Sequence, residues 1–153
     1  FAEKEEIAYT TLDDLYRHSD IISLHCPLTE ETRYMIDEEA ISKMKDGVMI
    51  INTGRGQLIH TNALIEGLKE KKIGSAGLDV YEEENGYFYE DKSDKIISDD
   101  VLARLLSFNN VIVTSHQAFF TKEALENIAD TTLQNIQDFI EGKPLVNEVL
   151  PLE

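Results

Sequence analysis

The sequence predicts an α/β fold in which helices cover both faces of a parallel β-sheet. Short, continuously apolar segments, such as "VMII" at residues 48–51, are typical of strands that are buried on both faces. Longer segments with apolar residues every three or four positions separate them and predict amphipathic helices. Strands and helices that alternate in this way favour a parallel sheet. With 153 residues, 42% of them hydrophobic, the chain can bury a core of its own.

Two helices and two strands are predicted in the first third of the chain. Thr11 and Asp14 form a capping-box pattern, which places the start of the first helix. The segment "DIISLH" predicts a short buried strand after that helix. Asp37 can cap the second helix and Gly47 can end it, immediately before the strand "VMIIN".

The rest of the chain continues the alternation. Thr61 is expected to cap a third helix, and "IGSAGLDVY" predicts a strand whose small residues allow close packing. Residues 82–100 are mostly polar and charged and predict an excursion from the sheet, with a short helix at about 99–106. The longest helical pattern, at 121–141, carries an apolar stripe made of Leu125, Ile128, Ala129, Leu133, Ile136 and Ile140. The predicted strands cover residues 20–25, 48–52, 73–81 and 110–116.

The net charge disfavours two classes of partner, and the cysteine content indicates the compartment. Acidic residues outnumber basic ones by 30 to 14, giving a formal net charge of -16, which disfavours nucleic acid and anionic membrane surfaces. No apolar run approaches the ~18 residues that a membrane span needs. The single cysteine, Cys26, excludes an internal disulfide and suits a reducing compartment, so a cytoplasmic location is predicted.

Chemically distinctive side chains follow the predicted strands. In a parallel α/β sheet, ligands bind beyond the carboxyl ends of the strands. Arg55, between two glycines, follows the second strand, Asp79 and the acidic run at 82–84 follow the third, and His116 follows the last. One guanidinium, one imidazole and several carboxylates are therefore expected to converge on one edge of the sheet. No metal site is predicted.

This set of side chains suits the reduction of a keto acid. Arginine presents a fork of donors that matches a carboxylate, and a histidine beside a carboxylate can act as an acid or base near neutral pH. The glycines around Arg55 are expected to allow unusual backbone angles and the close approach of a ligand. Taken singly, a Gly-Arg-Gly triplet is typical of a turn with a solvated arginine, and an acidic run is typical of a solvated loop. Only the combination indicates a site.

Three longer motifs resemble a known family. They are "HCPLTEET", "INTGRGQLIHTNALIEGLKEKKIGSAGLDVYEEE" and "NVIVTSHQAFFTKEAL", and they resemble the D-isomer-specific 2-hydroxyacid dehydrogenases in order and spacing. The insert "GYFYEDKSD" and the segment "SHQAFFTKEALENIADTTLQNI" are most similar to the D-lactate dehydrogenase branch of that family. The resemblance implies a Rossmann-like sheet that forms the C-terminal part of a dinucleotide-binding domain.

The resemblance also implies roles for individual residues. Arg55 would grip the substrate carboxylate, His116 would protonate the keto oxygen, and Glu84 would pair with His116. Asp79 would lie beside the nicotinamide. The implied contacts with the cofactor, NAD, are Cys26, Pro27, Thr32, Thr53, Gly54, Arg55 and Asp79.

The same resemblance divides the chain and leaves alternatives open. Residues 1–116 would belong to the NAD-binding domain, and 117–153 would return to a substrate domain that is not in this sequence. The G-x-G-x-x-G turn that cradles a pyrophosphate occurs nowhere in the chain, so the first strand-helix-strand unit is expected to be missing as well. The implied reaction is the reduction of pyruvate to D-lactate by a homodimer that associates through this domain. The alternatives are a different 2-keto acid substrate, or a non-catalytic module that senses dinucleotide or only dimerises.

Overall fold

The computed structural model describes residues 7–84, 87, 94 and 97–149. The elements follow the order α1 (Leu12–His18), β1 (Ile21–Leu24), α2 (Glu38–Lys43), β2 (Val48–Asn52), a 3-10 helix η1 (Gly56–Leu58), α3 (Thr61–Lys69), β3 (Ile73–Leu78), α4 (Asp100–Leu106), β4 (Val111–Val113) and α5 (Lys122–Ile140). The chain divides into two units, Phe1–His116 and Gln117–Glu153. Most of the predicted insert "GYFYEDKSD" lies outside the described residues.

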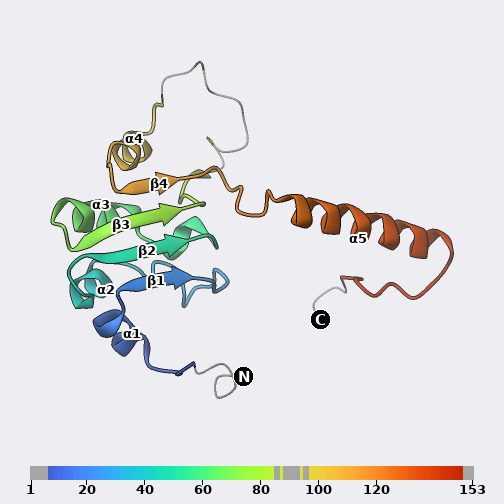
Figure 1. Cartoon of the computed structure of the whole chain (residues 1–153), viewed down its shortest axis with the longest axis horizontal. Coiled ribbons are helices and arrows are strands. Elements are labelled where there is room, and N and C mark those ends of the chain that lie inside the picture. The colour runs from blue at the N-terminus through green and yellow to red at the C-terminus, as the bar shows by residue number, and fades with distance from the viewer. Residues whose placement is uncertain (1–6, 85–86, 88–93, 95–96, 150–153) are drawn as a thin grey trace. The chain divides into compact units, whose positions relative to one another are not determined.

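The four strands form one parallel sheet in the order β1-β2-β3-β4 (Figure 1). Each strand pairs with the next strand along the chain, in a register that aligns Ile22 with Ile50, Ile50 with Ala76, and Ala76 with Val111. The carboxyl ends of all four strands therefore lie at one edge. The predicted α/β class with a Rossmann-like parallel sheet is confirmed.

The two faces of this sheet differ in burial. On one face Ile22, Ile50 and Ala76 are buried in a core shared with the helices, whereas on the other Ile21 is 61% exposed and Ile112 is 70% exposed. Strands that follow one another in a single direction have right-handed crossovers, which place every connecting helix on the same face. The described helices of this unit thus cover one face, and the expected cover of the second face is not among them.

The core of the first unit explains why these helices form. Ile50, Leu64 and Ile73 are 0–1% exposed and pack from β2, α3 and β3 into one cluster. Full burial of such a side chain contributes about 1.5–3 kcal/mol each. The apolar face of each short helix is therefore stabilised mainly by the sheet, because helices of this length are marginal by themselves.

Two of the three predicted N-caps are confirmed. The Asp14 N–H donates to Thr11 Oγ1 at 3.1 Å, and the Ala40 N–H donates to Asp37 Oδ1 at 2.8 Å, as the capping patterns predict. The predicted cap at Thr61 is wrong, because His60 is the N-cap of α3 and makes no side-chain capping bond. The physical reason is a distant partner for the Thr61 hydroxyl, which is described with the site below.

Three strands are shorter than predicted. β1 lacks the outer residues of 20–25, β3 ends at Leu78 and β4 covers only Val111–Val113. Residues beyond the strand ends still form backbone hydrogen bonds, but these lead into the turns at the edge of the sheet. The apolar pattern that predicted the strands extends beyond the observed strand ends, because the residues of those turns are also partly apolar.

The second unit consists mainly of α5. Thr121 caps it by accepting from the Ala124 N–H at 3.2 Å, so the predicted start is confirmed. No residue of α5 is buried, and its predicted apolar stripe is exposed: Leu125 39%, Ile128 52%, Leu133 65%, Ile136 51% and Ile140 77%. The assignment of 117–153 to a substrate domain stays a prediction.

Candidate active site

The carboxyl edge of the sheet is built by backbone hydrogen bonds that continue past the strands. The Asp79 N–H donates to the Asn52 carbonyl at 2.9 Å, and the His116 N–H donates to the Asp79 carbonyl at 2.7 Å. The end of β2 and the residues after β3 and β4 are thus held side by side. The structure brings the predicted strand-end residues Asp79 and His116 into direct contact.

His116 and Glu84 are hydrogen-bonded within this edge. His116 Nδ1 lies 3.0 Å from Glu84 Oε1, and the two side chains are 28% and 16% exposed. A carboxylate can only accept, so Nδ1 carries the hydrogen and Nε2 is the nitrogen that can exchange a proton with a ligand. His116 has φ of 55°, a left-handed conformation that is costly for a residue with a side chain and is typical of functional sites.

Arg55 lies in a turn that a buried asparagine holds in place. Asn52 is 1% exposed, its amide nitrogen donates to the Arg55 carbonyl at 2.9 Å, and its amide oxygen accepts from the Gly54 N–H at 3.0 Å. The Arg55 guanidinium is exposed and donates to the Gly54 carbonyl at 2.8 Å. Within the described residues it forms no ion pair, so its charge is available to an anionic ligand.

The two glycines beside Arg55 have different surroundings. Neither has a positive φ, so the expected need for unusual backbone angles is wrong. A Cβ on Gly56 would lie 2.1 Å from the Tyr81 carbonyl oxygen, whereas a Cβ on Gly54 would meet its nearest neighbour, Leu58 Cδ1, at 3.4 Å. Gly56 is required because the backbone after β3 passes against it. This contact joins the arginine turn to the loop that carries the acidic run.

Asp79 is the buried carboxylate of the site. It is 4% exposed, and its Oδ1 accepts a short hydrogen bond from the Thr114 hydroxyl. Burial of a charge is costly unless hydrogen bonds compensate for the lost water, and Thr114 supplies one. Thr53, beside it at the end of β2, is exposed at the same edge.

The remaining predicted residues lie in the loop after β1. The Thr32 hydroxyl donates to the Pro27 carbonyl at 2.7 Å and accepts from the Thr29 N–H at 2.8 Å, so Thr32 holds the shape of its own loop. Cys26 is half-buried, with its Sγ 3.5 Å from Met35 Sδ. Contact of these residues with a cofactor stays a prediction.

Three residues of the site were not predicted from the sequence. They contribute hydrogen bonds rather than reacting groups: Asn52, Thr61 and Thr114. Asn52 was visible as a polar residue at the end of a buried strand, which is a usable signal. The other two had no signal, because their partners lie 21 and 35 residues away in the sequence. Glu82 was expected at this edge as a member of the acidic run, but its partner Thr61 was not.

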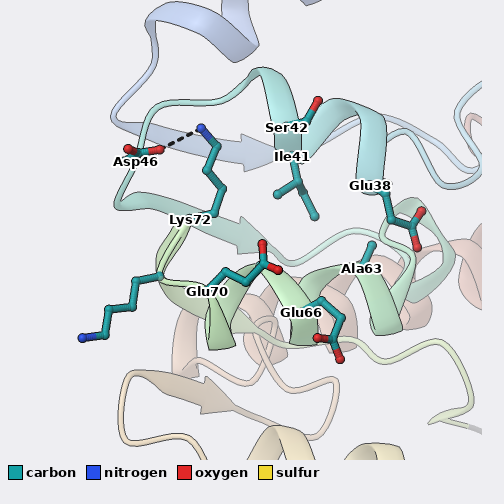
Figure 2. Close-up of a pocket in the computed structure, with 10 residues that line it drawn as sticks. Glu38, Ile41, Ser42, Asp46, Ala63, Glu66, Glu70 and Lys72 are labelled. Carbon is teal, nitrogen blue, oxygen red and sulfur yellow. Dashed lines mark hydrogen bonds and ion pairs between the residues drawn. The ribbon is translucent and has the colours of Figure 1, made fainter.

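A separate groove lies on the helical layer. It has a volume of about 580 Å³ and runs between α2 and α3, and Figure 2 shows Glu38, Glu66 and Glu70 along it, with Lys72 paired to Asp46. None of the predicted site residues lines it. Among the described residues, no group of three or more His, Cys, Asp or Glu side chains could hold a metal ion, and no helix is long and apolar enough to cross a membrane.

Comparison with known proteins decides the family. Residues 1–118 match the family described as D-isomer specific 2-hydroxyacid dehydrogenase, NAD binding domain. The chain belongs to this family. The resemblance seen in the sequence motifs is thereby confirmed, and so is NAD as the cofactor of this dehydrogenase domain.

Individual relatives agree with the family. The D-lactate dehydrogenase of Escherichia coli is 51% identical over 144 residues, which are 94% of this chain and 44% of that protein. An aromatic 2-oxoacid reductase of Clostridium sporogenes is 54% identical over 136 residues, 89% of this chain and 41% of that protein. The crystal structure of a D-lactate dehydrogenase from Treponema pallidum superposes with a TM-score of 0.91 at 38% identity, covering 99% of this chain and 46% of that chain. The chain thus spans less than half the length of these dehydrogenases.

The residues present suit a dinucleotide at this edge. Thr53 and Gly54 lie at the end of β2, half-buried or exposed, and Asp79 places a carboxylate beside them that can accept from an amide. The sheet edge therefore has the donors and acceptors that a nicotinamide would need. The G-x-G-x-x-G turn that would cradle a pyrophosphate does not occur in this sequence.

Proposed function

We propose that this chain is the catalytic and NAD-binding part of an enzyme that reduces a small 2-keto acid, pyruvate, to the D-2-hydroxy acid. The observation that carries the proposal is the pair of His116 and Glu84, 3.0 Å apart at the same edge as the Arg55 turn. A proton donor, its orienting carboxylate and an anion-binding guanidinium are the groups that this reaction needs.

Each side chain has one role in the proposed reaction. Arg55 binds and orients the carboxylate of the keto acid through its planar fork of donors. His116 gives a proton from Nε2 to the keto oxygen, and Glu84 holds the ring through Nδ1 and stabilises its protonated form. When bound, NADH supplies the hydride that the carbonyl carbon receives, so the carbonyl becomes a hydroxyl-bearing carbon. In the reverse direction His116 takes the proton back from the hydroxyl.

The size of the substrate side chain is the second question. The relatives are named for lactate and for aromatic oxoacids, and both are at least 51% identical to this chain. Pyruvate is proposed first because the resemblance to the D-lactate dehydrogenase branch extends into the segment after His116. An aromatic 2-keto acid is the alternative. Steady-state kcat/KM of the full-length enzyme for pyruvate and for phenylpyruvate, at one NADH concentration, separates the two.

A non-catalytic sensing module is the other alternative. It has no need of a proton donor, so the presence of Arg55, Glu84 and His116 together argues against it. Failure of the full-length enzyme to oxidise NADH with either keto acid, while it still binds NADH, would contradict both proposed substrates and favour the sensing module. The predicted homodimer and the cytoplasmic location stay part of the proposal.

Two substitutions test the roles of the pair. His116→Ala should lower kcat/KM by on the order of 10²–10⁴ across the pH range, because a general acid contributes about that much. Glu84→Gln keeps an oxygen that can accept from His116 Nδ1 but removes the negative charge beside the ring. It should therefore lower kcat/KM by less than His116→Ala does, with the NADH dissociation constant unchanged. His18→Ala, on the exposed end of α1, is the matched control and should change neither.

A further inference from the structure

The loop after β3 carries three consecutive glutamates with different surroundings. Glu84 contacts His116, Glu83 is exposed, and Glu82 is half-buried against α3. We propose that Glu82 is a positioning residue, whose carboxylate ties this loop to two other segments and thereby keeps Glu84 in contact with His116. This inference rests on the proposed function of the pair.

Both oxygens of Glu82 are in use. Oε2 accepts from the Thr61 hydroxyl at 2.8 Å and from the Thr61 N–H at 3.3 Å, and Oε1 accepts a short hydrogen bond from the Tyr34 hydroxyl. The first N–H groups of a helix have no partner within the helix, and His60, the N-cap of α3, offers no side-chain acceptor. Glu82 therefore caps α3 from another segment, and its negative charge is favourable at a helix N-terminus.

Tyr34 is a fixed anchor at the other side of this carboxylate. Its φ is 53°, a left-handed conformation that a residue with a side chain keeps only when its surroundings hold it. Its N–H donates to the Gln57 carbonyl at 2.8 Å, and the Arg33 guanidinium lies over its ring at 5.0 Å. The bond from Tyr34 to Glu82 thus links the loop after β1 with the loop after β3.

Tyr81, next to Glu82, connects these fixed segments to the pair of Glu84 and His116. The Tyr81 N–H donates to Glu84 Oε2 at 3.2 Å, while Glu84 Oε1 contacts His116. The Tyr81 hydroxyl donates to Asp99 at 2.8 Å, and burial, followed by this hydrogen bond, raises the pKa of Tyr81 well above its ordinary value. With Tyr81 held by Asp99 and Glu82 held by Thr61, the N–H that orients Glu84 has a fixed position.

The test compares Glu82→Gln with Glu83→Gln in the full-length enzyme. Glutamine has one acceptor oxygen and an amide that only donates, so it cannot accept from both hydroxyl partners of Glu82. A shift of about 1 Å in a reacting group can cost up to about 100-fold, so Glu82→Gln is expected to lower kcat/KM by roughly 10- to 100-fold. Glu83→Gln carries the same change of charge on an exposed side chain and should leave kcat/KM unchanged.

A comparison of kcat with binding separates positioning from simple loss of stability. His116 contacts Glu84 through its ring and Asp79 through its backbone N–H. If Glu82 positions Glu84, Glu82→Gln should lower kcat, leave the NADH dissociation constant unchanged, and have little further effect when it is added to Glu84→Gln. No loss of kcat, or the same loss in the Glu84→Gln background as in the unmodified enzyme, would overturn the inference. Absence of turnover in the unmodified enzyme would instead contradict the proposed function.

Substitution of the partners gives an independent measurement. Tyr34→Phe and Thr61→Val each remove one hydroxyl that Glu82 accepts from, and each should lower kcat by less than Glu82→Gln does. Thr61→Ser keeps the hydroxyl and should keep the kcat of the unmodified enzyme. In a double-mutant cycle, Tyr34→Phe added to Glu82→Ala should have no further effect, because Ala removes both oxygens and the bond is already lost. Fully additive effects would show that the two residues act separately.

Discussion

Gly56→Ala is the perturbation for which the structure predicts the sharpest outcome. The added Cβ would lie 2.1 Å from the Tyr81 carbonyl oxygen and 2.6 Å from the Glu82 nitrogen, whereas real Cβ atoms essentially never come within 3.0 Å. Both neighbours are backbone atoms, so no side-chain rotation relieves the contact. The arginine turn and the loop after β3 must separate by about 1 Å. Overpacking of this kind costs about 1–3 kcal/mol of stability.

The same displacement should also lower the catalytic activity. Arg55 precedes Gly56, and the displaced loop carries Glu84, so substrate anchor and proton donor move apart. A misplacement of about 1 Å can cost up to about 100-fold in kcat/KM. Thermal unfolding and steady-state kinetics of the full-length enzyme measure the two effects separately.

Gly54→Ala is the matched control for the stability effect. Its Cβ would have ordinary contacts, at 3.4 Å from Leu58 Cδ1, 3.5 Å from Asn52 Oδ1 and 3.6 Å from the Leu24 carbonyl. Its stability should change by only about 0.5 kcal/mol. The reasoning is refuted if Gly56→Ala unfolds at the same temperature as Gly54→Ala and has the kcat/KM of the unmodified enzyme. The close approach of the two backbones would then affect neither stability nor activity.

Three further outcomes are expected. Arg55→Lys keeps the charge but loses the planar fork, so kcat/KM for the keto acid should fall strongly while NADH binding is kept; unchanged kinetics would make Arg55 a turn residue only. The 153-residue chain by itself should bind NADH weakly in calorimetric titration, because it has no glycine-rich turn for the pyrophosphate, and a micromolar dissociation constant would contradict this. Burial, followed by the charge of Asp37, raises the pKa of Tyr16 to about 12, so its ionisation, followed by ultraviolet absorbance, should lag behind that of exposed Tyr9. The folded state favours the neutral phenol, so this contribution to stability is present below pH ~10 and is lost as the pH rises toward 12.

Short-range patterns in the sequence determined much of the fold. The starts of α1, α2 and α5 follow from Thr11, Asp37 and Thr121, because a cap and its N–H partner are three residues apart. The strands follow from their apolar runs. The rule that ligands bind at the carboxyl ends of parallel strands placed Arg55 and His116 at the correct edge.

Contacts between distant segments were decided only by the tertiary structure. Periodicity and composition do not distinguish Glu82, Glu83 and Glu84, and only the family resemblance singled out Glu84. The fold brings Glu84 to His116, 32 residues away, and Glu82 to Thr61, 21 residues away, and leaves Glu83 exposed. The close approach of the Tyr81 backbone to Gly56 could not be predicted from the sequence either.

The distribution of helices over the sheet shows the same limit. The sequence predicted parallel strands but not their spatial order, and the order β1-β2-β3-β4 is what leaves Ile21 and Ile112 exposed on the second face. Apolar periodicity indicates which side chains tend to pack against another segment, and it does so for the exposed stripe of α5 as well. Which partner lies there depends on strand order, register and chain crossings, and these are set by packing across the whole fold.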